Sequence, residues 1–276
     1  MHVRLKEFAK TGRKVSEIGM GTYYDPLWIA TAFLGWRRGA GAKVGAIKTG
    51  LEAGMTLVDT AEIYGSEPLV AEAIRHRKRD EVFLATKVWS NHLHRDTLVR
   101  SLNKSLRRLD TSYIDLYQVH FPNERVSIGE TMGAMEELVR EGKLMHVGVS
   151  NFNLQQLEEA HSALPRTELS SVQLDYSLIR RGVERDVLPY CDREGIALLA
   201  YYPMGHGKLA SDPRLDGVGS RRGKTRSQVA LRWLAEKTNV FPIPRASNYE
   251  HVSENVGASD WELDDPDEME LLTNFR

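Results

Sequence analysis

The sequence predicts an α/β fold, a (β/α)8 TIM barrel, because short aliphatic or β-branched runs alternate with stretches of helical spacing almost to the end of the chain. Eight strand-then-helix units fit into the 276 residues, and barrels of this class commonly have about 250 residues. A doubly wound parallel sheet is the main alternative, but it usually has fewer strands and a crossover at its middle. The number of units favours the barrel.

The elements follow one another in a regular order. Strands are expected at 16–21, 55–59, 82–87, 113–119, 144–150, 169–175, 196–202 and 239–244. Helices are expected at about 42–53, 66–77, 95–109, 129–141, 153–163, 183–194, 225–237 and 249–258. Segment 3–15 is expected to form an N-terminal hairpin cap that turns at Thr11-Gly12. The tail 261–276 predicts an extra C-terminal helix, and no linker divides residues 1–276, which are expected to form one domain.

Composition and charge limit the classes of partner. Hydrophobic residues make up 41% and charged residues 27% of the chain, as in ordinary folded proteins. The formal net charge of −1 gives no field that would attract nucleic acid or an anionic membrane. No apolar run approaches the length of about 18 residues that spans a bilayer. Because the single cysteine, Cys191, excludes an internal disulfide, we expect a cytoplasmic protein; its oligomeric state stays open.

Polar side chains follow the expected strands at their carboxyl ends. Asp59, Lys87 and His120 close three of these strands, and Tyr64 follows shortly after the first of them. Other strands end in the same way, at Ser150, Asn151, Gln173 and Tyr201. Each residue alone has an ordinary explanation, such as a helix cap, a surface lysine or a core histidine. Because a barrel builds its active site from these strand ends, their joint placement favours a site for proton transfer to or from an oxygen.

Two motifs carry a resemblance to a known family. Residues 59–65 read D-T-A-E-I-Y-G, and residues 147–152 read V-G-V-S-N-F. With Gly19-Met20-Gly21-Thr22 before them and Ile243-Pro244 after them, the chain resembles the aldo-keto reductase superfamily over nearly its whole length, in the prokaryotic type with a short C-terminal tail. The resemblance implies reversible NAD(P)H-dependent reduction of small aldehydes or ketones to alcohols.

The resemblance assigns the catalysis to four residues. Tyr64 is the proton donor, Asp59 and Lys87 lie around it, and His120 orients the substrate carbonyl. A free tyrosine has a pKa of about 10, and a neighbouring ammonium favours the phenolate. We therefore expect Lys87 to lower the pKa of Tyr64, with Asp59 holding the ammonium in place.

A nicotinamide cofactor is implied as well, because no side chain supplies a hydride. No G-x-G-x-x-G follows the first strand, so a Rossmann cradle is not expected. By the resemblance, Ser150, Asn151 and Gln173 bond the carboxamide, and Tyr201 stacks on the nicotinamide ring.

The adenine end of the cofactor site departs from the family pattern at one position. Arg245, Glu254 and Asn255 match the pattern, but His251 stands where the family has an arginine. A guanidinium binds a 2′-phosphate bidentately at any pH, whereas a histidine does so only as a protonated point donor. We expect NADP(H), with NAD(H) as an alternative.

Two longer segments are expected to border the site. The glycine-rich basic loop 205–223, with Gly205 and Lys208, is expected to cover the cofactor's pyrophosphate. Segment 25–43 is longer than a turn needs and is expected to form a specificity lid or an interface. Aromatic side chains are expected to surround the substrate: Tyr24, Trp28, Trp89 and Phe121. Such walls suit small aldehydes, ketones, sugars or dicarbonyls without choosing between them.

Two other functions remain open from the residues. His92 and His94, with His120 and Asp59, could hold a catalytic zinc ion in a (β/α)8 hydrolase, although such a site would leave Lys87 unexplained. The reductase hypothesis needs no metal. The chain could also be a non-catalytic nicotinamide-binding subunit that regulates a membrane protein. The presence of all four catalytic positions, the quartet Asp59, Tyr64, Lys87 and His120, disfavours this function.

Overall fold

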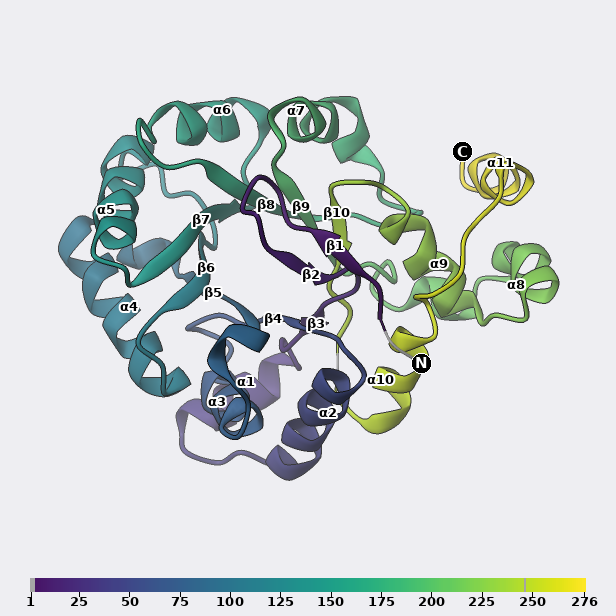
Figure 1. The fold of residues 1–276 in the computed structure, drawn as a ribbon, viewed down its shortest axis with the longest axis horizontal. Coiled ribbons are helices and arrows are strands. Elements are labelled where there is room, and N and C mark those ends of the chain that lie inside the picture. Colours follow the sequence, from purple (N-terminus) through teal and green to yellow (C-terminus); the bar gives the residue numbers. More distant parts are fainter. Residues whose placement is uncertain (1–2, 246) are drawn as a thin grey trace.

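The computed structural model describes residues 3–245 and 247–276. Its centre is a parallel sheet of eight strands in which sequence neighbours are also spatial neighbours (Figure 1). The strands are β3 (Met20–Gly21), β4 (Leu57–Asp59), β5 (Phe83–Val88), β6 (Ile114–Val119), β7 (Leu144–Ser150), β8 (Leu169–Asp175), β9 (Ala197–Tyr201) and β10 (Val240–Pro242). The backbone N–H groups of Gly19 and Gly21 donate to the carbonyls of Pro242 and Pro244, each over 2.9 Å, which brings the first and last strands together. The expected barrel is confirmed.

Helices form a ring around the strands (Figure 1). They are α2 (Ala40–Glu52), α3 (Glu67–Ile74), α4 (Arg95–Leu109), α5 (Ile128–Arg140), α6 (Leu154–Ser162), α7 (Val187–Glu194), α9 (Arg226–Ala235) and α10 (Tyr249–Val256). The strands are covered on both faces, so β5 and β6 are buried at every residue. This explains why their sequences are continuous apolar runs broken only by a few polar residues.

The expected hairpin closes one end of the barrel. Strands β1 (Leu5–Glu7) and β2 (Lys14–Ser16) pair in antiparallel fashion. Phe8, at the end of β1, places its ring 4.7 Å from that of Phe83 and 5.0 Å from that of Phe241. The hairpin therefore plugs the amino end of the strands with aromatic side chains and leaves their carboxyl end for the site.

The expected C-terminal helix is present as α11 (Asp265–Asn274). The side chain of Asp264 caps it by accepting a hydrogen bond from the N–H of Asp267, and Pro266 lies in its first turn. This helix packs beside α8 (Asp216–Arg222), outside the ring (Figure 1).

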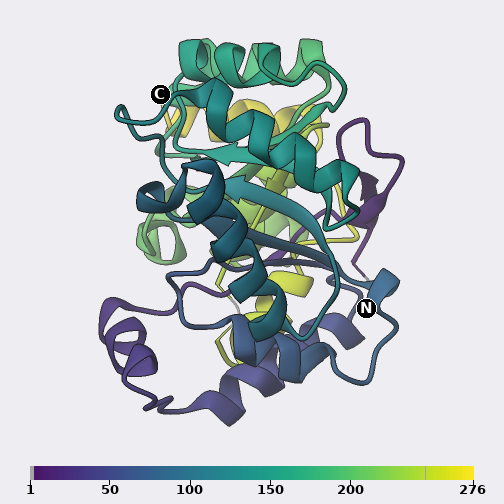
Figure 2. The same ribbon diagram turned by 90° about the vertical axis from the view of Figure 1, so that its left-hand side faces the viewer.

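The expectations were wrong at two helices. The helix expected over 183–194 is divided into a 3-10 turn, Gly182–Arg185, and α7, because Asp186 leaves helical geometry and caps α7 through the N–H of Val187. No helix was expected within 26–33, but segment 25–43 contains α1 (Pro26–Phe33). The side chain of Asp25 caps α1 by accepting a hydrogen bond from the N–H of Trp28. Figure 2 shows α1 at the end of the barrel opposite the hairpin.

Within residues 3–245 and 247–276, every helix is too short or too polar to cross a membrane.

Candidate active site

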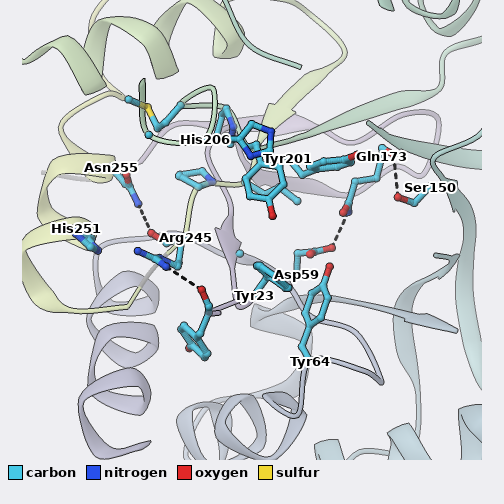
Figure 3. Close-up of a pocket in the computed structure, with 18 of the residues that line it drawn as sticks. Tyr23, Asp59, Tyr64, Ser150, Gln173, Tyr201, His206, Arg245, His251 and Asn255 are labelled. Atoms are coloured by element: carbon cyan, nitrogen blue, oxygen red, sulfur yellow. Dashed lines mark hydrogen bonds between the residues drawn. The ribbon is translucent and has the colours of Figure 1, made fainter. Parts of the chain in front are cut away.

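A cavity of about 710 Å³ opens at the carboxyl ends of the strands. Most of the residues expected at the site line it: Tyr24, Asp59, Tyr64, Trp89, His120, Phe121, Ser150, Asn151, Gln173, Tyr201, Arg245, His251, Glu254 and Asn255. Figure 3 shows that the labelled side chains among them, such as Tyr64 and His251, come from opposite sides of a common space. The fold thus brings together residues from Tyr24 to Asn255, which lie near opposite ends of the chain.

An ion pair lies at the floor of this cavity. The Nζ atom of Lys87 is 2.7 Å from Oδ2 of Asp59 and 2.9 Å from the carbonyl oxygen of Thr60. Burial lowers the pKa of Lys87, and the carboxylate of Asp59 opposes this shift. The other oxygen of Asp59, Oδ1, accepts a hydrogen bond of 2.8 Å from the amide of Gln173. Asp59 therefore holds the ammonium in place, as expected.

Tyr64 lies between this pair and His120. Its hydroxyl is 3.3 Å from Nε2 of His120, and the Nζ atom of Lys87 lies 4.9 Å from the centre of its ring. The pKa of Tyr64 is raised well above its ordinary value, chiefly by burial and then by the charge of Asp59. The expectation of a lowered pKa at Tyr64 is therefore wrong, because burial of the phenolate and the charge of Asp59 dominate. The phenol is protonated at neutral pH and can act as an acid.

His120 is a neutral imidazole in this site. Burial, and then the charge of Lys87, lower its pKa to about 2. Its Nδ1 atom is buried and has no hydrogen-bond partner among the described residues. The ring stacks on Phe121 at 5.3 Å and meets the ring of Trp89 edge-on at 5.2 Å. Packing, more than hydrogen bonding, sets its orientation.

This low pKa predicts a pH dependence of stability. The unfolded chain binds a proton at His120 below about pH 6.5, whereas the folded chain does so only near its pKa of about 2. His120 therefore lowers the free energy of unfolding as the pH falls through this range, because the unfolded state binds more protons. Urea unfolding of wild type and His120→Asn at several pH values checks this. The variant should lose less stability on acidification; parallel pH curves would contradict it.

Backbone strain and amide groups mark the next part of the cavity. Asn151 directly follows β7 with a φ of 61°, in the left-handed region. Its amide donates to the carbonyl of His120 over 2.9 Å, and its Oδ1 accepts from the hydroxyl of Tyr201 over 2.7 Å. The hydroxyl of Ser150 donates to the carbonyl of Gln173 over 3.0 Å. Amide and hydroxyl groups are thus held in fixed positions along this part of the cavity.

The far end of the cavity is basic. Nη1 of Arg245 donates to the carbonyl of Tyr24 over 2.9 Å, and Nδ1 of His251 lies 2.8 Å from the hydroxyl of Ser247. Asn255 bonds the carbonyl of Arg245, while Glu254 accepts from the hydroxyl of Thr225. This end lies across the cavity from Tyr64 (Figure 3). An extended ligand with a neutral ring at one end and a phosphate at the other fits this distribution of groups.

Four of the residues expected at the site do not line the cavity. Lys87 is fully buried beneath it. Trp28 is buried against Tyr24, 5.1 Å between ring centres, so it supports the wall from behind. Gly205 packs against Ile179, and Lys208 opens a 3-10 helix, Lys208–Ser211. From the same loop, His206 and Gly207 reach the cavity instead.

The arginines of the loop 205–223, expected to face the cofactor, do not line the cavity. The loop folds into two 3-10 helices and α8, and its arginines pair with carboxylates. Arg221 and Arg222 both contact Asp267 of α11, and Arg214 contacts Asp212. These arginines form ion pairs within the protein, and the contacts of Arg221 and Arg222 with α11 explain their presence in the sequence.

Other residues of the site were missed. The amide of Gln118 lies at 3.5 Å from Oδ1 of Asp59 and is fully buried. The sequence does indicate that Gln118 belongs to the site, because it precedes His120 by two residues in a strand and residues two apart face the same side. Tyr202 and Glu62 had no such signal. Tyr202 lines the cavity with a φ of 47°, in the left-handed region. This backbone conformation depends on the fold and could not be predicted from the sequence.

The two histidines considered as metal ligands point to different carboxylates. His92 contacts Glu62 at 2.9 Å, and His94 contacts Glu130 at 3.0 Å. Across the part of the chain that the structure describes, no cluster of three or more His, Cys, Asp or Glu residues has the arrangement of a metal site.

Comparisons with known proteins agree with the barrel and its polar strand ends. The family model described as the Aldo/keto reductase family matches residues 40–275. Aldo-keto reductase YhdN of Bacillus subtilis (strain 168) is 32% identical, over 96% of this chain and 91% of its own. Methylglyoxal reductase YeaE of Escherichia coli (strain K12) is 33% identical, over 80% of each chain.

Solved structures give the same result. The thermostable aldo-keto reductase Tm1743, solved with the inhibitor epalrestat, superposes with a TM-score of 0.90 at 35% identity, over 99% of this chain and 100% of the other. An aldo/keto reductase from Klebsiella pneumoniae, solved with NADP and acetate, gives 0.84 at 33% identity, over 98% and 94%. The barrel, with its site at the carboxyl ends of the strands, is thus an oxidoreductase that acts on carbonyl groups. The chain belongs to the aldo/keto reductase family.

Proposed function

We propose that the protein reduces small aldehydes or ketones with NADP(H), and that Tyr64 gives the proton to the carbonyl oxygen. The observation that carries this proposal is the buried Asp59–Lys87 pair beneath a protonated Tyr64 that also contacts His120. The bound nicotinamide would supply a hydride to the carbonyl carbon. The relatives named as methylglyoxal reductases support a small dicarbonyl as one substrate.

Each residue of the quartet has a separate part in this proposal. Tyr64 holds its proton until the carbonyl oxygen becomes negative, because burial disfavours a phenolate. Neutral His120 donates a hydrogen bond from Nε2 to the same oxygen and orients it. The ammonium of Lys87 stabilises the negative charge left on Tyr64 after transfer, and Asp59 keeps that ammonium fixed.

Residues along the cavity would hold the cofactor. Ser150, Asn151 and Gln173 offer hydroxyl and amide groups to the carboxamide, and Tyr201 offers a ring face beside them. Arg245 offers positive charge and His251 a ring nitrogen to a 2′-phosphate at the other end. Structures of related reductases from Klebsiella pneumoniae were solved with NADP and with NADPH, which supports this choice of cofactor.

The cofactor phosphate is expected to depend on His251. Replacing His251 by Arg should raise kcat/KM with NADPH relative to NADH by about tenfold, because an arginine adds a bidentate, permanently charged contact worth about 1.4 kcal/mol or more. Steady-state kinetics with both cofactors, before and after the substitution, measures this ratio. An unchanged ratio would mean that His251 does not contact the phosphate.

A panel of small aldehydes, ketones, sugars and dicarbonyls, followed by the absorbance of NADPH, tests the proposed function as a whole. The aromatic walls made by Tyr23, Trp89 and Phe121 should give broad use of small, uncharged carbonyl compounds. Failure to oxidise NADPH with every member of the panel would sink the proposal. Methylglyoxal is the first compound to test.

The remaining predictions concern the chain as a whole. A cytoplasmic location and a single domain over residues 1–276 are our proposals, supported by the single cysteine and by one continuous barrel. Cell fractionation and limited proteolysis check them.

A further inference from the structure

A second buried carboxylate lies beside the quartet. Glu62 belongs to the turn between Asp59 and Tyr64, and only 7% of its surface is exposed. Its Oε1 atom accepts a hydrogen bond from the backbone N–H of Trp89 at 2.5 Å and lies 2.9 Å from Nδ1 of His92. A carboxylate is costly to bury unless such bonds compensate the loss of water. Both of its partners belong to the segment that follows β5.

Glu62 thereby joins two neighbouring loops of the barrel. Its backbone N–H also donates to the carbonyl of Lys87 over 3.2 Å. The turn that carries Tyr64 is therefore fastened to the end of β5 by both the main chain and the side chain of one residue. A shift of either loop would break a buried, charge-assisted hydrogen bond.

Trp89 transmits this constraint to the fourth member of the quartet. Its ring lies 5.2 Å from that of His120, at an interplanar angle of 89°. The ring of Trp89 also meets that of Phe121 edge-on at 5.7 Å, and the ring of Phe121 stacks on that of His120. Because Nδ1 of His120 has no hydrogen-bond partner among the described residues, these aromatic contacts largely determine how the imidazole is turned.

We infer that Glu62 is a positioning residue of the reduction: it fixes the backbone of Trp89 and, through the indole, the imidazole of His120. The inference rests on the proposed function, because it assigns His120 the task of orienting the carbonyl. Glu62 itself is not expected to touch the substrate or the cofactor, since it does not line the cavity. Its removal should disturb orientation, to which reaction rates are sensitive.

Glu62→Ala and Glu62→Gln test this inference. The alanine variant should lower kcat/KM for the carbonyl substrate about tenfold or more, because a small misplacement of a catalytic group is costly. The Kd for NADP⁺ should change less than about twofold. The glutamine variant keeps an oxygen that accepts from Trp89, so it should restore kcat/KM to within about threefold of wild type.

A matched control separates positioning from stability. Asp115 is another buried carboxylate on a barrel strand, but it bonds Arg79 and the backbone N–H of Leu84 and does not line the cavity. Asp115→Asn should lower Tm while leaving kcat/KM unchanged. A fall in kcat/KM that simply follows Tm in all of these variants would overturn the inference.

A spectroscopic readout makes the inference independent of turnover. The ring proton signals of His120, assigned with His120→Asn in the full-length protein, should shift in Glu62→Ala and stay in place in Glu62→Gln and Asp115→Asn. Trp89→Leu keeps Glu62 and should shift the same signals, so it serves if Glu62→Ala does not fold. Unmoved His120 signals in Glu62→Ala, or in Trp89→Leu when it replaces that variant, contradict the inference. Absence of wild-type turnover would instead contradict the proposed function.

Discussion

Replacing Tyr64 by Phe is expected to lower kcat by about 10²- to 10⁴-fold, the usual contribution of a positioned general acid. The Kd for NADP⁺ should stay within about twofold, because the hydroxyl of Tyr64 contacts His120 and lies away from the basic end of the cavity. The variant keeps the ring, so the packing against Tyr23 at 5.2 Å between ring centres is retained. Stopped-flow and steady-state kinetics with NADPH measure the loss.

Tyr117 offers a matched control for this variant. It is a fully buried tyrosine on β6 whose hydroxyl has no hydrogen-bond partner in the described chain, and it does not line the cavity. Tyr117→Phe removes the same atom outside the site, so kcat should not change. If both variants lose activity equally, Tyr64 has no special role in proton transfer.

Replacing Lys87 by Met is expected to affect both activity and stability. The ammonium is fully buried and paired with Asp59, so its loss leaves a carboxylate uncompensated in the barrel. Breaking a buried pair in this way costs about 3–5 kcal/mol of unfolding free energy. Activity should fall as strongly as in Tyr64→Phe, because the phenolate formed after proton transfer loses its nearest cation. Urea unfolding and kinetics measure the two effects.

The double variant Asp59→Asn with Lys87→Met separates these effects. Removing both charges should recover much of the lost stability, since no buried charge is left unpaired. Activity should not recover. Recovery of activity together with stability would show that the pair only holds the fold.

The barrel could be predicted because its signals are local. Runs such as 114–119 and 144–150 are short and mostly apolar, as is typical of buried parallel strands. The quartet was predictable for the same reason: polar residues that end such runs are forced onto one rim. The interior amide of Gln118 follows this rule too, although it was overlooked.

What the sequence did not reveal depends on contacts between distant segments. Arg221 and Arg222 look like phosphate ligands until α11 brings Asp267 against them. The pKa of Tyr64 likewise depends on burial, which a list of neighbouring charges does not contain. Nothing in the sequence distinguishes Glu62, and only the fold brings the N–H of Trp89 to it.

The most direct test of the account is to follow deuterium from the cofactor to the product. NADPH deuterated on one face of the nicotinamide ring at a time would be used with methylglyoxal and the wild-type enzyme, and the product analysed by mass spectrometry and NMR. We predict that one of the two labelled cofactors places a single deuterium on the carbinol carbon, because the cavity fixes which face meets the carbonyl beside Tyr64. A product without deuterium, or with deuterium from both faces, would contradict hydride transfer in this site.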